Sequence, residues 1–334
     1  MIRTILVPLD GSAFAERALP IATELGRRHG ASLRLVTVHD PKRAYVTSPE
    51  LMAAIDEANA DALAEAGAYL RRKADEVKAH GVTSTVALWP GDPATVLLEE
   101  FQRQVDLVVM TTHGRGGISR AWLGSVADRV VRKGRCPVLL LRADATPRSV
   151  TRLLEDVLVP LDGTVRAESV LDDVHELMSH ADGTLHLLNV VIQPFLLDPP
   201  PRPSYAEGRA ATVEQQRLRG YRYLRRLARP LRLDGKAIAT EVVAGSDPVE
   251  EILAYVRQHD VRLVAIATRG RGGFARWAIG SVADKVIRSG TAAVLVVHTE
   301  TVREGNEFST GYEAALTEPE DSDRLEALEQ PVPG

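Results

Sequence analysis

Cysteine is almost absent from this sequence, since Cys136 is the one cysteine in 334 residues. A single cysteine excludes an intramolecular disulfide and a cysteine-based zinc site, and such usage is typical of a reducing compartment. No apolar run approaches the ~18 residues that a membrane span needs. The first ten residues hold too short an apolar stretch for a signal peptide and end in an acid. We therefore expect a cytoplasmic protein.

An excess of charge and several well-known motifs are also missing. The chain has 41 basic and 45 acidic residues, for a net charge of −4. This balance argues against a dedicated nucleic-acid binder. There is no G-x-x-x-x-G-K-[ST] loop, no G-x-G-x-x-G after the first apolar run and no G-x-S-x-G nucleophile elbow. The histidines are scattered and lack the spacing of metal ligands.

The chain does contain an internal repeat. The sequence ILVPLDGS at 5–12 returns as VLVPLDGT at 157–164, and GRGG at 114–117 returns at 270–273. Between 114–132 and 270–288, 12 of 19 positions are identical. Each copy spans about 150 residues, which is the size of a domain and too long for a solenoid repeat. We therefore expect two tandem domains, at 1–145 and 152–298.

Strand and helix patterns alternate within each copy. Strands that are apolar on both faces and are joined by helices indicate a parallel sheet covered on both sides. Right-handed crossovers then give a doubly wound α/β layer. The expected strands are 4–9, 32–38, 82–88, 107–111 and 137–141, then 156–161, 184–191, 237–243, 263–268 and 293–297. The expected helices are 13–29, 49–80, 93–104 and 126–133, then 165–180, 208–231, 248–259 and 282–289.

Two charged segments stand apart from these patterns. Residues 299–334 contain ten acids and two arginines, which predicts a disordered tail. This tail is either simply solvated or holds a short partner-binding or self-masking element near 323–328. Eight arginines lie at 209–232. They form either a solvated helix face or, as the second interpretation, a contact for nucleic acid.

A glycine-rich segment lies between an expected buried strand and an expected helix in each copy. Glycine lets the backbone approach a ligand closely, and the helix starts at 124–125 and 280–281 point free N–H groups outward. Arg115 adds a guanidinium group suited to phosphate. These features favour an anion site. The alternative is structural, because Ser125-x-x-Asp128 resembles a capping box and such loops contain glycine without a ligand.

An acidic residue ends the first strand of each copy, namely Asp10 and Asp162. It lies at the carboxyl edge, where doubly wound sheets bind ligands. There it accepts hydrogen bonds from a ribose or base, or it caps the next helix. By contrast, His113 has Arg269 as its counterpart. That difference excludes a general base shared by both copies at this position.

Together these motifs resemble the universal stress protein family in its tandem two-domain form, over about 1–142 and 152–298. The family's ATP-binding members carry G-x2-G-x9-G-[ST] after the fourth strand. Gly114 with Gly124-Ser125 fits this pattern, and so does Gly270 with Gly280-Ser281. Thr111 and Ala267 stand in place of the first glycine.

The resemblance implies a fold, a ligand and a set of binding residues. The fold is a five-stranded parallel sheet of order 3-2-1-4-5, similar to the adenine nucleotide alpha hydrolases, with domains paired through their last strands at 138–141 and 294–297. This pairing gives an intrachain pseudo-dimer, and a homodimer of chains is also plausible. The ligand is ATP, with Mg²⁺ arriving on the nucleotide. The family's acid and adenine-contacting valine correspond to Asp10 and Val38, and to Asp162 and Val190.

The candidate binding residues include the neighbours of these positions. In the first copy they are Pro8, Leu9, Asp10, Val38, Met110, Thr112, His113, Gly114, Arg115, Gly117, Gly124, Ser125 and Val126. In the second they are Pro160, Leu161, Asp162, Val190, Ile266, Thr268, Arg269, Gly270, Arg271, Gly273, Gly280, Ser281 and Val282. We expect no catalytic residues and no metal held by the protein alone.

Three functions remain open from the sequence. The leading hypothesis is a stress-response protein that binds ATP in one or both domains without dedicated catalysis. The second is a slow ATPase in which Asp10 and Asp162, or bound Mg²⁺, position a water molecule. The third is a nucleotide-free interaction module, for which Thr111 and Ala267 are the argument, since their side chains would crowd the base or ribose. The differences between the copies predict unequal sites.

Overall fold

The computed structural model describes residues 1–41, 48–101, 104–112, 123–142, 149–193, 203–233, 237–268 and 280–298. Several predictions lie outside these residues. They concern the acidic tail at 299–334 and the glycine-rich residues His113, Gly114, Arg115, Gly117, Arg269, Gly270, Arg271 and Gly273.

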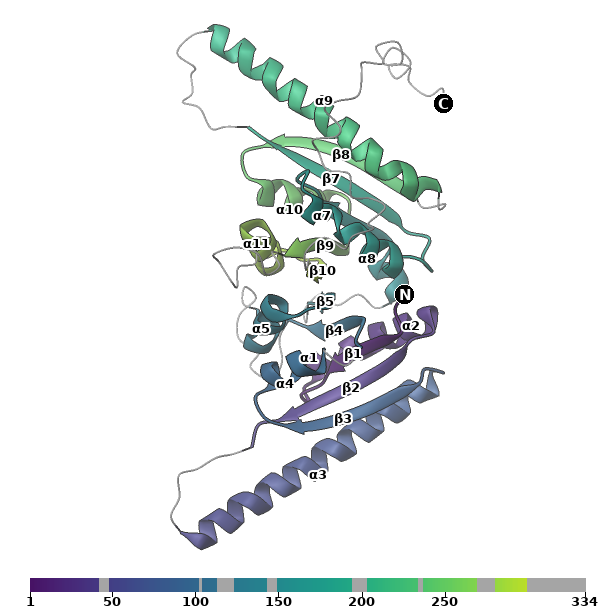
Figure 1. The fold of residues 1–334 in the computed structure, drawn as a ribbon, viewed down its shortest axis with the longest axis vertical. Coiled ribbons are helices and arrows are strands. Elements are labelled where there is room, and N and C mark those ends of the chain that lie inside the picture. The colour runs from purple at the N-terminus through teal and green to yellow at the C-terminus, as the bar shows by residue number, and fades with distance from the viewer. Residues whose placement is uncertain are drawn as a thin grey trace.

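The first repeat folds into a parallel sheet with helices on both faces (Figure 1). Its strands are β1 (Thr4–Pro8), β2 (Ser32–His39), β3 (Ser84–Pro90), β4 (Leu107–Thr111) and β5 (Val138–Leu141). Its helices are α1 (Ala13–Glu16), α2 (Ala18–His29), α3 (Pro49–Ala79), α4 (Pro93–Glu100) and α5 (Ser125–Lys133). Every strand predicted from the sequence is present, within two residues at each end.

The second repeat follows the same plan after a short connecting helix, α6 (Val150–Leu153). Its strands are β6 (Asp156–Pro160), β7 (Thr184–Ile192), β8 (Ala237–Gly245), β9 (Leu263–Thr268) and β10 (Ala293–His298). Its helices are α7 (Val165–Glu168), α8 (Val170–Leu177), α9 (Pro203–Leu233), α10 (Pro248–Gln258) and α11 (Ser281–Ser289). The duplication inferred from the sequence is therefore a duplication of structure.

The two halves join into one ten-stranded sheet of order β3-β2-β1-β4-β5-β10-β9-β6-β7-β8. Within each half the strand order is 3-2-1-4-5, as the family resemblance implies. The pairings within a half are parallel, whereas β5 and β10 run antiparallel with Leu139 opposite Leu295. The molecule is consequently long, with one domain at each end of its long axis (Figure 1).

Two apolar cores cover the two faces of this sheet. One contains Leu25 of α2, Leu70 of α3 and Leu227 of α9, all buried. The other contains Val130 of α5 and Val286 of α11. Burial on both faces explains why β4 and β5 are apolar at nearly every position. Because β5 and β10 are antiparallel, each half of the sheet has its own edge formed by the carboxyl ends of its strands.

Two helices that the sequence predicts as continuous are each split near their start. The first breaks at Arg17, whose N–H donates to Phe14 O, three residues back, at 3.2 Å. The second breaks at Ser169, between α7 and α8. Both residues keep right-handed helical backbone angles, so apolar spacing does not reveal the breaks. Helix α6 was not predicted, although its Val150 and Leu153 are fully buried.

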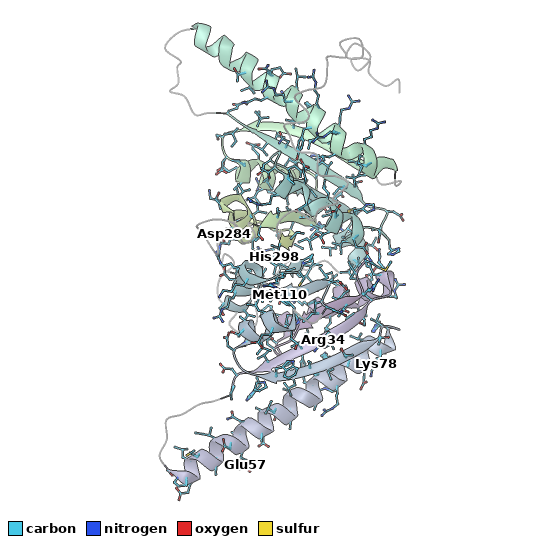
Figure 2. The ribbon with its side chains drawn as sticks, viewed as in Figure 1. Arg34, Glu57, Lys78, Met110, Asp284 and His298 are labelled. Atoms are coloured by element: carbon cyan, nitrogen blue, oxygen red, sulfur yellow. The ribbon has the colours of Figure 1, made fainter. Side chains whose placement is uncertain are left out.

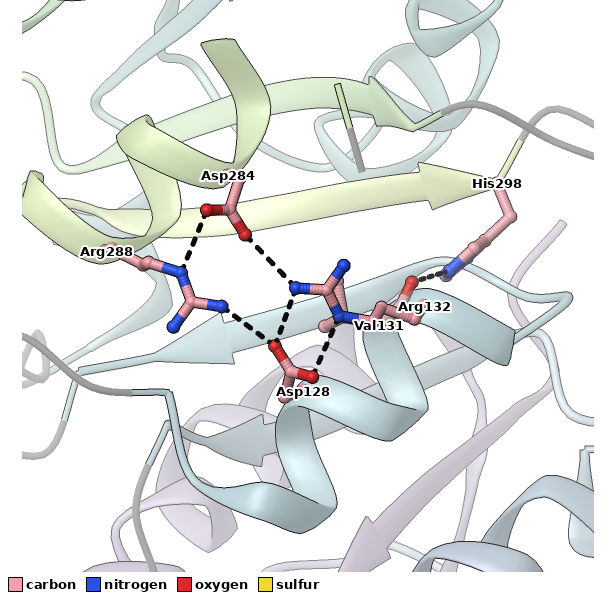
Figure 3. A network of polar contacts seen from close by, with 6 residues as sticks. All are labelled: Asp128, Val131, Arg132, Asp284, Arg288 and His298. Atoms are coloured by element: carbon pink, nitrogen blue, oxygen red, sulfur yellow. Dashed lines mark hydrogen bonds and ion pairs between the residues drawn. The ribbon is translucent and has the colours of Figure 1, made fainter. Parts of the chain in front are cut away.

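Four charged side chains bridge the domains beside the β5–β10 pair (Figure 3). On α5, Arg132 pairs with Asp128 at 2.8 Å, and on α11, Arg288 pairs with Asp284 at 3.0 Å. Each arginine also reaches the other helix, with Arg288 Nη2 2.9 Å from Asp128 Oδ1 and Arg132 Nη2 3.4 Å from Asp284 Oδ1. We call these four residues the interdomain network.

His298, which ends β10, and Arg142, which follows β5, add further contacts across this boundary. The ring of His298 lies with Nε2 2.6 Å from the carbonyl oxygen of Val131 and Nδ1 3.0 Å from that of Cys136. On the other side, Arg142 donates to the carbonyl oxygen of Ile287 at 3.3 Å. Side chains of both domains thus contact backbone carbonyl groups of the other domain.

The turn into β7 has no room for a side chain at Gly183. A Cβ there would lie 1.7 Å from the carbonyl oxygen of Leu154. We expect Gly183→Ala to lower the free energy of unfolding by at least about 2 kcal/mol, because backbone must move. The matched control is Gly67→Ala within α3, where the nearest atom is the end of Arg71 at 3.5 Å. In urea unfolding, this control should leave the free energy of unfolding unchanged or raise it by up to about 1 kcal/mol. Equal losses of free energy in the two variants would contradict the close packing at Gly183.

Candidate functional site

A cavity of about 1150 Å³ lies at the carboxyl ends of β1, β2 and β4, beside the start of α5. This is the position at which doubly wound sheets bind ligands, and the volume suffices for a nucleotide-sized molecule. Every candidate residue of the first repeat that the structure describes lines this cavity. They are Pro8, Leu9, Asp10, Val38, Met110, Thr112, Gly124, Ser125 and Val126.

The loop that follows β1 is ordered by Asp10. Its Oδ1 accepts a hydrogen bond from the N–H of Ser12 at 2.9 Å, while Gly11 between them takes a φ of 79°. Ser12 is the N-cap of α1, and its hydroxyl accepts from Ala15 N at 3.2 Å. The positive φ explains the glycine. The capping role thus belongs to Ser12, and Asp10 supports the turn while it lines the cavity.

The same turn recurs in the second repeat. Asp162 Oδ1 accepts from the N–H of Thr164 at 3.0 Å and from its hydroxyl at 2.6 Å. Gly163 has a φ of 83°, and the Thr164 hydroxyl caps α7 by accepting from Ala167 N at 3.2 Å. Both aspartates are therefore held in one orientation by their own loops, each at the carboxyl edge of its own half of the sheet.

The junction of β1 and β2 is fixed by bonds that the sequence did not reveal. Leu9 N donates to Val36 O at 2.8 Å, and the Thr37 hydroxyl donates to Leu9 O at 2.8 Å. In the second repeat, Asn189 takes the place of Thr37 and donates its Nδ2–H to Leu161 O at 2.8 Å. A hydroxyl in one copy and an amide in the other perform the same task. Comparison of the two copies could have found this pair.

Helix α5 points its first turn at the cavity. Gly124 is the N-cap, no side chain caps the helix, and Ser125, Val126 and Ala127 all line the cavity. Backbone N–H groups in the first turn have no partner within their helix, and the helix dipole makes this end positive. The capping-box interpretation was wrong, because Asp128 turns away to Arg132 and Arg288. The arrangement suits an anion.

Thr111 does not close the cavity. It is the last residue of β4, only 6% exposed, and it forms part of the cavity wall. Two backbone hydrogen bonds fix the next residue, Thr112. Its N–H donates to Leu141 O at 2.9 Å, and its carbonyl oxygen accepts from Gly124 N at 2.8 Å. A β-branched residue in place of the first motif glycine therefore remains compatible with an open site.

One wall of the cavity comes from α3 and was missed. Ala62, Glu65, Ala66, Ala68, Tyr69 and Arg72 of this helix line it. Burial and the nearby charge of Glu16 raise the pKa of the Tyr69 hydroxyl, so the phenol is neutral. The internal repeat could have indicated these wall residues, because Tyr69 and Arg72 return 154 residues later as Tyr223 and Arg226.

In the second domain, the described candidates occupy the corresponding strand ends and helix start. The last residue of β6 is Pro160, and Leu161 and Asp162 follow it. Val190 lies on β7, and Ile266 and Thr268 lie in the last three residues of β9. Gly280 is the N-cap of α11, again without a side-chain cap, and Ser281 and Val282 begin the helix. Leu161 N donates to Leu188 O at 2.7 Å, as Leu9 N does to Val36 O. The backbone frame of the site is thus repeated.

The described residues show little that suits covalent or metal chemistry. Burial raises the pKa of the Cys136 thiol to about 12, so it is no nucleophile at neutral pH. Over the described ranges, no three histidine, cysteine, aspartate or glutamate side chains gather closely enough to hold a metal ion. A separate search of the same ranges finds no helix long and apolar enough to cross a membrane. The site instead offers backbone donors, a fixed carboxylate and an apolar wall.

Comparison with known proteins gives a consistent result. The model of the universal stress protein family matches residues 1–142 and 154–298. A universal stress protein of Mycolicibacterium smegmatis is 25% identical over 304 residues, covering 88% of this chain and 96% of the relative. One of Mycobacterium tuberculosis is 28% identical over 317 residues, covering 87% and 94%.

A solved structure supports the fold over the same span. The crystal structure of a universal stress protein from Archaeoglobus fulgidus has a TM-score of 0.64 and 19% identity, covering 88% of this chain and 98% of that one. At this identity the likeness concerns the fold. Because the family model matches both halves and the strand order is that of the family, this chain belongs to the universal stress protein family, with two such domains in tandem.

Proposed function

We propose that the protein binds ATP with Mg²⁺ at the carboxyl edge of the sheet in one or both domains, and acts as a nucleotide-responsive stress protein without dedicated catalysis. The observation that carries the proposal is the cavity of about 1150 Å³. It combines an uncapped helix start, a fixed aspartate and apolar side chains within one space.

The residues around the cavity fit the parts of a nucleotide. The first-turn N–H groups of α5 would bind phosphate oxygens, and Val38 with Met110 would pack on the base. Asp10 would accept hydrogen bonds from the ribose. On the same wall, Nε2 of His39 is buried, and no hydrogen-bond partner for it is present among the described residues. A buried polar atom of this kind favours a polar ligand.

Magnesium would enter with the nucleotide rather than through a protein cage. Mg²⁺ keeps several waters and is commonly bound through phosphates with one or two carboxylates. It would offset phosphate charge. Nucleotide occupancy would then shift a conformational equilibrium or a partner-binding surface.

The proposal also covers the domain organisation, the assembly and the cellular location of the protein. The two domains span 1–145 and 152–298, and an acidic tail at 299–334 serves as a solvated or partner-binding segment. We infer that the β5–β10 pair holds the two domains together in solution as an intrachain pseudo-dimer, and that the protein works in the cytoplasm. A homodimer of chains is a further expectation.

The test is the nucleotide content of the protein. The full chain is purified without added nucleotide and denatured, and the released ATP, ADP and AMP are counted per chain. We expect an adenine nucleotide at a stoichiometry approaching one or two per chain. A protein that releases none, and that retains none after gel filtration with Mg-ATP, would favour the nucleotide-free interaction module.

The slow ATPase remains the enzymatic alternative. An in-line attack on the terminal phosphate needs an oriented water molecule. Hydrolysis that disappears in Asp10→Asn/Asp162→Asn while ATP binding persists would support it. The absence of turnover in the loaded wild-type protein over hours would instead leave binding as the function.

A further inference from the structure

Helix α9 has an outer face made of arginine side chains. Its inner face packs on β7 and β8 through the buried side chains of Tyr223, Leu224 and Leu227. Residues three or four positions apart share one face of a helix. Four exposed arginines with this spacing lie on the side away from the sheet, and we call them the arginine stripe: Arg219, Arg222, Arg225 and Arg229.

The arginine stripe lacks counter-charges on the part of the chain that the structure describes. The acid that precedes it on α9, Glu214, lies 3.7 Å from Arg217. Across the described ranges, no acidic side chain forms an ion pair with a member of the stripe. Four like charges along about 15 Å of helix repel one another. An anionic segment that covers the stripe would therefore be held by complementary charge.

The stripe is a property of the second domain alone. Helix α3 is the counterpart of α9, and Leu70 of α3 is buried as Leu224 of α9 is. At the four positions of the stripe, 154 residues earlier, α3 has one base and two acids, namely Glu65, Ala68, Arg71 and Asp75. The same packing of helix on sheet thus forms without the arginines, so the fold does not require them.

The chain itself contains a segment of complementary chemistry after β10. The acidic tail at 299–334 has ten acids and two arginines, for a net charge of −8. Six of the acids fall within 318–329, where Leu325 and Leu328 alternate with them. The stripe offers a matching apolar contact, because Leu218 is 44% exposed one turn before Arg222. Acids and leucines of the tail therefore match arginines and a leucine of the helix.

The tail starts close enough to α9 to reach the stripe. In the sheet order, β10 and β8 are four strand spacings apart, which is roughly 19 Å. The helix that covers β8 adds a layer about 10 Å thick. Residues 318–329 follow His298 by 20 to 31 positions, and a random coil of that length spans on average about 25–30 Å. The span of the chain thus suits the separation.

The acids of α3 are too far away to serve as this counter-charge within one chain. Helix α3 packs on β2 and β3, and these strands lie at the other end of the ten-stranded sheet from β7 and β8. Figure 2 shows Glu57 on the projecting part of α3, at the opposite end of the molecule from α9. These acids could meet the stripe only from a second copy of the chain.

We propose that the acidic tail docks on the arginine stripe of its own chain, with 318–329 as the contacting part. The inference is independent of nucleotide binding. A single exposed ion pair is weak, but the tether holds the tail near the helix at a millimolar effective concentration. The docked tail covers the stripe and keeps other polyanions from it. High salt releases the tail, because salt screens exposed charges.

Cysteine trapping in the full chain tests this contact. Gln215→Cys places a thiol on the exposed face of α9 one turn before Leu218, and Ser322→Cys places one among the acids of the tail. Cys136 does not compete, because it is buried and burial raises the pKa of its thiol to about 12. We expect the intrachain disulfide to form about tenfold faster in 0.1 M than in 1 M salt. Its rate should not depend on protein concentration.

Charge variants of the trapping protein identify the cause. Arg222→Gln/Arg225→Gln/Arg229→Gln should slow the intrachain disulfide by about tenfold in 0.1 M salt. The matched control removes three exposed cations of the same domain that lie outside α9, by Arg166→Gln/Arg257→Gln/Lys285→Gln. The control rate should stay within about twofold of the parent rate. Equal slowing in the two variants, or slowing in neither, would overturn the proposal.

Two further results would assign the stripe to another occupant. A disulfide that forms mainly between chains, and faster at higher protein concentration, would make the stripe a contact between copies. The other occupant is a nucleic acid, and the probe is a single-stranded DNA of about 20 nucleotides. If the tail covers the stripe, Glu318→Gln/Glu320→Gln/Asp321→Asn/Asp323→Asn should strengthen DNA binding by about tenfold.

A matched change on α3 controls for net charge. Glu50→Gln/Asp56→Asn/Glu57→Gln/Asp61→Asn neutralises four exposed acids at the far end of the molecule. It should change the affinity for the same DNA by less than about threefold. Equal gains in the two variants, or equally tight DNA binding by the parent chain and the tail variant, would show that the tail does not cover the stripe and would contradict the proposal.

Discussion

Replacing Ser125 and Ser281 together with glutamate is expected to abolish ATP binding. Each residue is the first of its helix, after an N-cap glycine. A carboxylate there would lie beside the proposed phosphates and fill the anion site with the protein's own charge. We expect the affinity for Mg-ATP to fall by about a hundredfold or more, corresponding to roughly 3 kcal/mol. Calorimetric titration of the double variant measures this loss.

The glutamate substitutions are expected to weaken ATP binding without destabilising the fold. Both serines are exposed, so the larger side chain has room. An acid in the first turn of a helix is favourable for the helix dipole, so the free energy of unfolding should stay within about 0.5 kcal/mol of the wild type. Ser125→Ala/Ser281→Ala is the matched control, because it keeps the backbone donors, and it should bind within about threefold of the wild type. Wild-type affinity in the glutamate variant would place the phosphates elsewhere.

Reversing the charge of Asp128 is expected to produce the largest loss of stability at the domain boundary. This carboxylate accepts bonds from Arg132 on its own helix and from Arg288 on the other (Figure 3). Burial alone would raise the pKa of Asp128, but the hydrogen bond and charge of Arg132, together with Arg288, hold it below its usual value. Asp128→Arg would place a third guanidinium group among these cations. We expect a loss of about 2 kcal/mol in urea unfolding.

An exposed ion pair on α3 supplies the control for this reversal. Asp75 lies 3.9 Å from Lys78, and both side chains are mostly exposed. Asp75→Arg changes the charge of the chain by the same amount and should cost less than about 0.5 kcal/mol. Equal effects of the two substitutions would mean that the interdomain network contributes no more than a surface pair.

The central strands β1, β4 and β5 were predictable because they are apolar at nearly every position. Ile5, Leu6 and Val7 are fully buried from both faces, and such a run belongs in a parallel sheet. The repeat then predicted the second half from the first. The split of the first helix was not predictable, since Arg17 departs from the helix by a hydrogen-bond shift of one residue and leaves the apolar spacing unchanged.

The strand-end part of the site was predictable, and its helical wall was not. Asp10 and Ser125 stand in motifs that parallel-sheet topology brings to one edge. Tyr69 and Arg72 come from the middle of a long helix, where the sequence indicates only amphipathic spacing. Their place in the cavity depends on how α3 crosses the sheet, which is a property of tertiary packing. Comparison of the two copies was the available signal, because the sequence YLRR at 69–72 returns as YLRR at 223–226.

Calorimetric titration of the full chain, stripped of nucleotide, with Mg-ATP tests the central claim most directly. The account predicts saturable binding with one or two sites per chain, and the Ser125→Glu and Ser281→Glu variants assign each site to its domain. Saturation that persists unchanged when both serines are glutamate would contradict the location of the sites. A titration without binding heat at several temperatures, together with no retained nucleotide, would contradict nucleotide binding itself.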